Sequence, residues 1–339
     1  MINLNRSEVN NMGILLLTKS VFAIMIGFIP AIILGLVLIP FLRRRKIGQR
    51  ISIYVGNVHK KKEGTPTMGG LIFVLPTLIA TIALILTQKL ELTSNLFIIL
   101  FVFLGYAFIG FLDDFLSIKK KNNEGLTTYQ KLFLQLIIAL VFFYLYMQKG
   151  GQTSLVSSTL GIDIEMGWFY GVFLLFILIG ASNAVNLTDG LDGLAGGLSA
   201  ISFIAFGLIS ISVGFEEIGI FTFILVGALL GFLIFNTHPA KIFMGDTGSL
   251  ALGAVMAAIA ILTHREITLL VVASVFVVET LSVILQVVWM FLFHKKLFLM
   301  TPLHHHFEKI GWSETDIVKL FWVVGLILTM AGVYFGVWL

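Results

Sequence analysis

Four amide and carboxylate side chains recur every three residues between two long apolar runs, at Asn183, Asn186, Asp189 and Asp192. In an α-helix that spacing turns each side chain about 60° away from the previous one, so the four cannot share a face. We therefore expect the helix to break near Gly190 and Gly193. A broken helix that offers carboxylates and free backbone N–H groups beside apolar spans predicts a binding site. A polar loop with Asp and Asn as helix caps is the simpler alternative.

Asp113 and Asp114 end another apolar run. A carboxylate near hydrocarbon is costly and usually functional. Because adjacent helical side chains point about 100° apart, we expect two different roles, one towards a metal or phosphate and one towards a proton. Salt bridges with Lys119–Lys121 are the alternative.

Asp246 precedes a further apolar run within Gly245-Asp246-Thr247-Gly248-Ser249. Such a turn suits a hard cation that is held by few carboxylates and by substrate phosphates. The alternative is that Asp246, Thr247 or Ser249 only caps a helix. Phe243 lies in the same polar segment, where its ring can stack on a base or belong to the core.

Three consecutive histidines, His304, His305 and His306, follow Pro302. Their side chains diverge, so neutral imidazoles that bind phosphate or sugar oxygens fit better than one tridentate metal site, and at least one can be a buried structural histidine. The segment 62–70 combines Lys62 with glycines and Pro66, and it suits an anion or a simple turn that leads into a helix. Glu279, Ser282 and Gln286 share one helical face and should point into a bundle.

The composition is that of a membrane protein. Of 339 residues, 58% are hydrophobic and 12% charged, against about 25% charged in soluble domains. We expect an all-α integral membrane protein that forms a single domain over 1–339. The apolar stretches that are long enough, or nearly long enough, to span a bilayer are 14–42, 70–88, 96–112, 132–148, 167–183, 198–213, 218–236, 248–263, 267–293 and 317–338.

Composition also excludes several classes of site. There is no cysteine, which rules out disulfides and thiolate metal sites. The net charge of +4 comes from loop residues and does not indicate nucleic acid. The residues before the first apolar run are polar and that run is too long for a signal peptide, so we expect no cleaved leader.

The basic residues predict the orientation. Placing 43–69 in the cytoplasm puts seventeen of the 22 lysines and arginines inside, as the positive-inside rule requires. Both termini are then outside, and 150–167 is an outer segment that suggests a small hairpin. The polar motifs all fall in five cytoplasmic loops, which should form one cleft at membrane level: 62–70, 113–131, 183–197, 236–249 and 300–314.

These motifs together resemble a known family, the phospho-N-acetylmuramoyl-pentapeptide transferases of the polyprenyl-phosphate N-acetylhexosamine-1-phosphate transferase superfamily. The resemblance covers essentially the whole chain. The elements Asp113-Asp114 and Gly245–Ser249 resemble the superfamily at large, whereas Thr65–Gly70 and Pro302–Glu308 are typical of the muramoyl-pentapeptide branch.

The resemblance implies transfer of phospho-MurNAc-pentapeptide from UDP to undecaprenyl phosphate, giving lipid I and UMP with Mg²⁺ in the bacterial cytoplasmic membrane, by an enzyme that is typically a homodimer. It implies that Asp113 is the base on the lipid phosphate, and that Asp246 holds the metal with help from Asp114. His305 joins them as a catalytic residue. The implied substrate-binding residues are Lys62, Thr67, Lys121, Lys131, Asn183, Asn186, Asp189, Gly190, Asp192, Asn236, Phe243, His304 and His306.

Two positions depart from the family pattern. Ser117 and Tyr129 stand where the family often has basic residues, so Lys121 and Lys131 are left to neutralise the phosphates. A transporter or flippase is one alternative function, but such proteins place ionisable residues near the midplane of two repeated halves, whereas here only Glu279 lies deep. A related UDP-GlcNAc transferase is the other, and the Pro302–Glu308 element argues against it.

Overall fold

The chain forms a helical bundle with one small hairpin. The computed structural model describes residues 6–45, 64–120, 125–157 and 161–338. Its elements are α1 (Arg6–Arg44), α2 (Leu71–Leu86), α3 (Ser94–Lys120), α4 (Thr128–Gln148), β1 (Ser154–Ser157), β2 (Ile162–Glu165), α5 (Phe169–Thr188), α6 (Leu194–Ser212), α7 (Glu216–Asn236), α8 (Asp246–Leu262), α9 (Glu266–Val272), α10 (Ser274–Phe293), α11 (Leu303–Lys309) and α12 (Glu314–Trp338).

Each predicted apolar stretch is helical. Among the described residues eight helices are long and apolar enough to cross a membrane, and α2 and α8 are shorter apolar helices. The predicted span 267–293 is wrong as one continuous helix, because the chain breaks at Ala273 between α9 and α10. The short helix α11 inside the histidine segment was also not predicted. The break near Gly190 and Gly193 and the hairpin of β1 with β2 are confirmed.

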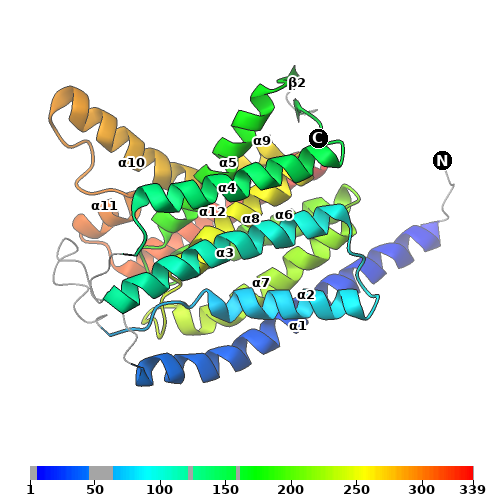
Figure 1. Ribbon diagram of the computed structural model, residues 1–339, viewed down its shortest axis with the longest axis horizontal. Helices are drawn as coiled ribbons and strands as arrows, with labels where there is room; N and C mark the ends of the chain where they lie inside the picture. Colours follow the sequence, from blue (N-terminus) through cyan, green and yellow to red (C-terminus); the bar gives the residue numbers. More distant parts are fainter. Residues whose placement is uncertain (1–5, 46–63, 121–124, 158–160, 339) are drawn as a thin grey trace.

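Helices α7 and α8 form the centre of the bundle. Nearly all of their side chains are buried, with α1 packed along α7, and α3 and α5 packed against α8 (Figure 1). Small residues allow the closest of these contacts. A Cβ atom on Gly27 of α1 would lie 2.0 Å from the carbonyl oxygen of Ile224, so the two backbones touch at this point. Close backbone approach through glycine is typical of helix packing in membranes.

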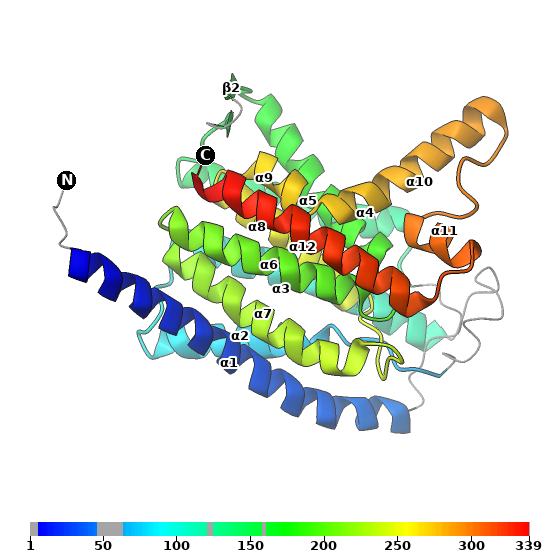
Figure 2. The same ribbon diagram turned by 180° about the vertical axis from the view of Figure 1, so that it is seen from behind.

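The two ends of the bundle differ. The start of α1, the end of α12 and the hairpin lie at one end, whereas the end of α1, the end of α3 and α11 lie at the other (Figures 1 and 2). That second end carries basic last turns, Arg43 and Arg44 on α1 and Lys119 and Lys120 on α3. The breaks α5–α6 and α7–α8 come at this end as well, so the predicted motif loops gather there.

Helix α10 has two distinct halves. Its polar face is buried, as predicted, with Glu279 fully buried and Ser282 and Gln286 nearly so. Its second half projects away from the bundle in both views (Figure 2) and exposes apolar side chains such as Phe291. The buried polar face runs from Glu279 in the first half to Gln286 in the second, where it contacts the segment that leads to α11.

Candidate active site at the junction of α3 and α8

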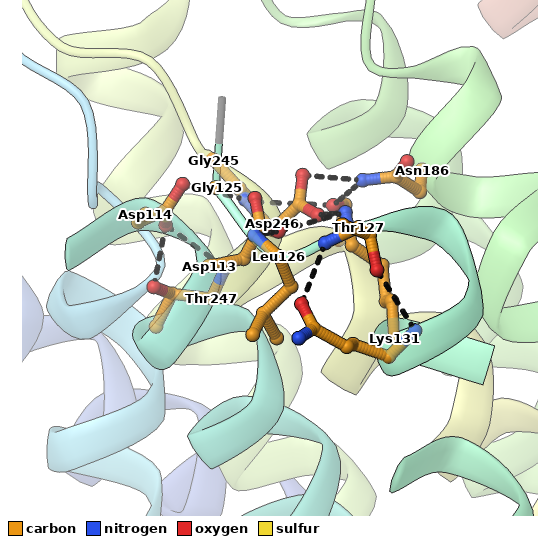
Figure 3. Close-up of polar contacts among 12 residues, drawn as sticks. Asp113, Asp114, Gly125, Leu126, Thr127, Lys131, Asn186, Gly245, Asp246 and Thr247 are labelled. Atoms are coloured by element: carbon orange, nitrogen blue, oxygen red, sulfur yellow. Dashed lines mark hydrogen bonds and ion pairs between the residues drawn. The ribbon is translucent and has the colours of Figure 1, made fainter. Parts of the chain in front are cut away.

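Asp114 fastens the start of α8 to α3. Its carboxylate accepts hydrogen bonds from the Thr247 hydroxyl (2.6 Å), the Thr247 backbone N–H (3.0 Å) and the Asp246 backbone N–H (3.2 Å). The first N–H groups of a helix have no partner within the helix. A buried carboxylate from a different helix thus caps α8 and fixes the backbone of Asp246 (Figure 3).

Asp113 points the other way, towards the start of α4. It accepts a hydrogen bond from the backbone N–H of Leu126 (2.9 Å) and lies 3.2 Å from the ammonium of Lys131. Lys131 also pairs with Asp246. A capping box between Thr127 and Gln130 begins α4, and it orders the first turn from which Lys131 reaches both carboxylates.

The three carboxylates form one group. Ligand oxygens of Asp113, Asp114 and Asp246 all lie within 4.8 Å of one another. Asn186, at the end of α5, donates to Asp246 (2.8 Å) and to the hydroxyl of Ser249 (2.9 Å) (Figure 3). Asp246 is therefore held by side chains from α4 and α5 and, through its backbone, by Asp114 of α3.

Asp189 adds a fourth carboxyl group just beyond α5. Burial, together with the charges of Asp246, Asp114 and Asp192, raises the pKa of Asp189 to about 8. The carboxyl is then largely protonated at neutral pH and can donate a hydrogen bond. A bound cation would favour its ionised form again. The protonation of Asp189 therefore depends on the charge present at the neighbouring carboxylates.

Glycines bring these elements into contact. Gly245 has a φ of 72°, and a Cβ atom there would lie 2.6 Å from Asp114 and 2.8 Å from the hydroxyl of Thr67. A Cβ atom on Gly110 would lie 2.0 Å from the carbonyl oxygen of Asp246. The segment before α8 also pairs with that before α2, since the N–H of Gly69 donates to the carbonyl of Phe243 (2.8 Å). Side chains larger than glycine would separate α8 from α3.

A second polar group ties the α5–α6 turn to the α7–α8 loop and to α12. The carboxylate of Asp192 accepts the N–H of Ala240 (3.0 Å) and contacts Nδ1 of His238 (3.0 Å), while its backbone N–H donates to Glu314 (2.7 Å). Asn236 accepts the N–H of Gly193 (3.1 Å) and donates to the carbonyl of Ile242 (3.0 Å). Asp192 and Asn236 therefore hold these loops together in addition to any contact with substrate.

The three histidines occupy different surroundings on α11. His304 is fully buried beside Glu279, which matches the alternative of one structural histidine. His305 pairs with Glu308, at 2.6 Å from Nδ1 to the carboxylate. Nδ1 of His306 accepts the N–H of Leu299 (3.2 Å), and its ring packs on Phe298. Only His305 and His306 are partly exposed.

The structure thus brings together a large part of the predicted set. Around Asp246 lie Asp113, Asp114, Lys131 and Asn186, with Thr67 behind Gly245. Asn183 instead directs its amide to Gln135 (2.9 Å) and to the carbonyl of Ile179. The ring of Phe243 is half-buried and outside the buried core. Lys62 and Lys121 lie outside the described residues.

Sequence reasoning gave no role to four polar partners. Gln135 binds Asn183, Glu308 binds His305, and His238 and Glu314 bind Asp192. Glu308 follows His305 by three residues, a spacing that can be recognised in a helix. The others come from segments distant in sequence, and no local pattern marks them.

Comparison with known proteins gives consistent matches. The family model described as "Glycosyl transferase family 4" matches residues 96–264, and "Phospho-N-acetylmuramoyl-pentapeptide-transferase signature 1" matches residues 62–74. The chain is 49% identical over 319 residues to the phospho-N-acetylmuramoyl-pentapeptide-transferases of Geobacillus thermodenitrificans and Bacillus subtilis, covering 94% of this chain and 98% of each relative. The similarly named protein of Oceanobacillus iheyensis is 47% identical over 322 residues, or 95% of this chain and 99% of that protein.

The geometry predicts different stability effects for the two adjacent aspartates. Asp114→Ala leaves the N–H and hydroxyl of buried Thr247 without an acceptor, which should cost about 1–3 kcal/mol and lower the melting temperature of the detergent-solubilised protein. Asp113→Ala is the matched neighbour, since its carboxylate is 14% exposed and lies beside other negative charges. Its melting temperature should change little. Equal decreases for both variants would contradict the capping role of Asp114.

Proposed function

Because this chain belongs to the family of phospho-N-acetylmuramoyl-pentapeptide-transferases, we propose that it transfers phospho-MurNAc-pentapeptide from UDP-MurNAc-pentapeptide to undecaprenyl phosphate. The products are lipid I and UMP, in the first membrane step of peptidoglycan synthesis. The observation that carries this proposal is the group of three carboxylates with Lys131 at one end of an apolar bundle. A water-soluble donor and a lipid phosphate can meet there.

In this reaction an oxygen of the lipid phosphate attacks the phosphorus that bears the sugar. A new P–O bond forms, the bond from that phosphorus to the UMP oxygen breaks, and UMP leaves with the electron pair. The second proton of a phosphate monoester has a pKa of about 6, so part of the acceptor is protonated at neutral pH. In this mechanism Asp113 accepts this proton, since its side chain is partly exposed and lies beside the other two carboxylates.

The carboxylate group fits a magnesium ion. Mg²⁺ prefers hard oxygen ligands and is commonly held by one or two carboxylates plus substrate phosphates. Asp246 and Asp114 would hold it, with their oxygens within 4.8 Å of each other. When bound, magnesium supplies charge neutralisation for the diphosphate. Lys131 contributes a further positive charge next to Asp246, and Asn186 fixes the orientation of the Asp246 carboxylate.

The donor pocket is proposed from the family resemblance and from placement. Phe243 lies in the loop before α8, two residues from Gly245, where its ring can stack on uracil. Gly190 and Asp192 belong to the neighbouring α5–α6 turn, and His305 and His306 to α11. Lys62 and Lys121 stay in the proposal as sequence-based assignments for binding the phosphates.

Orientation follows from charge. The end of the bundle that carries the site also carries the basic last turns of α1 and α3, which the positive-inside rule assigns to the cytoplasm. We propose a multi-pass protein of the bacterial cytoplasmic membrane with ten spans, both termini outside and the active site facing the cytoplasm. The family resemblance also predicts a homodimer, which light scattering of the detergent-solubilised protein would measure.

The function is tested with purified protein in detergent. UDP-MurNAc-pentapeptide, undecaprenyl phosphate and Mg²⁺ are supplied, and UMP release is followed. UMP should appear only when both substrates are present. Release with UDP-GlcNAc in place of the muramoyl donor would favour the related transferase instead.

Substitutions of Asp246 and Asp113 should impair the enzyme in different ways. Asp246→Asn removes a metal-ligand charge, so it should abolish activity and weaken Mg²⁺ binding measured directly by calorimetry. Asp113→Asn should lower kcat by about 10²–10⁴-fold, the usual scale of general-base catalysis, with Mg²⁺ affinity nearly unchanged. Raising the pH should restore part of this loss, because the lipid phosphate then loses its proton to solvent. Equal loss of Mg²⁺ in both variants, without recovery at high pH, would make Asp113 a metal ligand.

Phe243 should contribute to donor binding. Removal of a ring that stacks on a base costs about 1–3 kcal/mol in single-stranded nucleic-acid sites. Phe243→Ala should therefore raise KM for the UDP donor by about tenfold or more, with KM for the lipid acceptor unchanged. Phe243→Tyr keeps the aromatic face and serves as the control. An unchanged donor KM in Phe243→Ala would remove the ring from the nucleotide pocket.

Sidedness can be measured with single cysteines, since the chain has none of its own. Ser117→Cys lies near the end of α3 at the site end, and Ser154→Cys lies on β1 at the opposite end. In intact cells an impermeant thiol reagent should label Ser154→Cys only, and Ser117→Cys should react after permeabilisation. Labelling of both from outside would reject the proposed topology.

A further inference from the structure

Glu279 is a fully buried carboxylate in α10 that the proposed reaction does not use. A buried carboxylate without partners would be very costly. Both oxygens of Glu279 face His304, because the His304 backbone N–H donates to Oε1 (3.2 Å) and the His304 Nδ1 lies 3.2 Å from Oε2. The two residues are 25 positions apart in sequence, so this contact is a product of the fold.

The backbone contact serves α11. His304 is the second residue of this seven-residue helix, and N–H groups in a first turn have no partner within their helix. Glu279 supplies that partner from α10. Its side chain therefore fixes where the histidine-bearing helix begins and in which direction the His304 ring leaves the backbone.

The ring of His304 connects this contact to the predicted active site. It is fully buried, and a Cβ atom on Gly190 would lie only 2.4 Å from its Nε2. Nε2 has no hydrogen-bond partner among the described residues, and Nδ1 approaches Glu279 at ion-pair distance without good hydrogen-bond geometry. Catalytic hydrogen bonds are often loose before substrate binds. An unsatisfied buried nitrogen beside the Asp189–Gly190 turn calls for a physical reason.

We propose that Glu279 is a positioning residue for the transfer reaction. It holds the His304 imidazole with Nδ1 towards its carboxylate and Nε2 towards the Asp189–Gly190 turn. In a histidine the hydrogen-bond partner of one ring nitrogen sets the protonation state of the other. Glu279 thus determines which ring nitrogen of His304 points towards the turn that carries Asp189. This inference rests on the proposed function of the site.

Gln286, two turns further along α10, provides a matched comparison. Its side-chain oxygen accepts the N–H groups of Leu297 (3.0 Å) and Phe298 (2.9 Å), and its amide donates to the carbonyl of Phe298 (3.2 Å). Gln286 thus fastens the same α10–α11 connection from the same helical face, without contacting His304 in the described structure. Substitution of Gln286 therefore distinguishes a general loss of loop attachment from the loss of the specific contact between Glu279 and His304.

The test is a double-mutant cycle on UMP release with Glu279→Gln, His304→Gln and the double variant. Glu279→Gln keeps an oxygen acceptor for the His304 N–H but removes the charge that faces Nδ1. It should lower kcat by ~10–100-fold, by analogy with removal of the hydrogen-bond partner of a metal-ligating histidine, with both KM values changed less than threefold. In the His304→Gln background the same substitution should change kcat by less than twofold.

Controls make each outcome decisive. Gln286→Ala is tested alone and in the His304→Gln background. It should lower the melting temperature, and any effect on kcat should multiply with that of His304→Gln. Glu266→Gln alters another buried glutamate, at the opposite end and bonded to Tyr170 (2.5 Å), and should keep full activity. If Glu279→Gln does not fold, Glu279→Asp withdraws the charge by one methylene and takes its place in the cycle, with the same expected result.

Three results would overturn the inference: a wild-type kcat for the Glu279 variant, effects that multiply with His304→Gln, or a Gln286→Ala variant that reproduces the Glu279 pattern. Each of these is read against an active wild-type enzyme and an active Glu266→Gln variant. Absence of UMP release from the wild type itself would instead reject the proposed function. The two failures are therefore distinct.

Discussion

The mutual repulsion of three carboxylates at the start of α8 constrains everything around them. Ligand oxygens of Asp113, Asp114 and Asp246 lie within 4.8 Å of one another. Two like charges about 4 Å apart repel by about 4 kcal/mol at the effective dielectric constant of 20 that suits a protein surface. Lys131, the N–H groups of α8 and the amide of Asn186 offset part of this cost. Such a concentration of charge is favoured by a neighbouring cation, and the three carboxylates could hold a metal ion.

Helix packing keeps this charge in place. The carbonyl of Asp246 lies against Gly110, and Gly245 brings the start of α8 against Asp114 and Thr67. Because α7 and α8 are almost entirely buried, the position of Asp246 is set by the centre of the bundle. The side chains of Asp113 and Asp246 are 14% and 20% exposed and share Lys131, whereas Asp114 is buried. The buried carboxylate, Asp114, is thus the one that fixes the backbone at the start of α8, and the two carboxylates that share Lys131 remain accessible.

Local patterns in the sequence were sufficient for the apolar helices, the break at Gly190 and Gly193, the hairpin of β1 with β2 and the inward polar face of α10. Each of these depends on the periodicity or turn chemistry of consecutive residues. The break at Ala273 was missed because a continuous apolar sequence has the same composition whether it forms one helix or two. The pairings of Asp192 with Glu314, Asn183 with Gln135 and Glu279 with His304 were also missed. They join residues brought together only by helix packing, and a single sequence contains no sign of those distances.

Glu279 also bears on the kind of protein this is. From sequence it was the one deep carboxylate, and a deep carboxylate is typical of a coupling site in a transporter. In the folded chain Glu279 is buried, and both of its oxygens face His304, at the start of the helix that carries His305 and His306. The carboxylates of the proposed site lie elsewhere, at the junction of α3 and α8. A deep charge that supports a site at one membrane face suits an enzyme whose lipid substrate stays in that leaflet, because no ion has to cross the bundle.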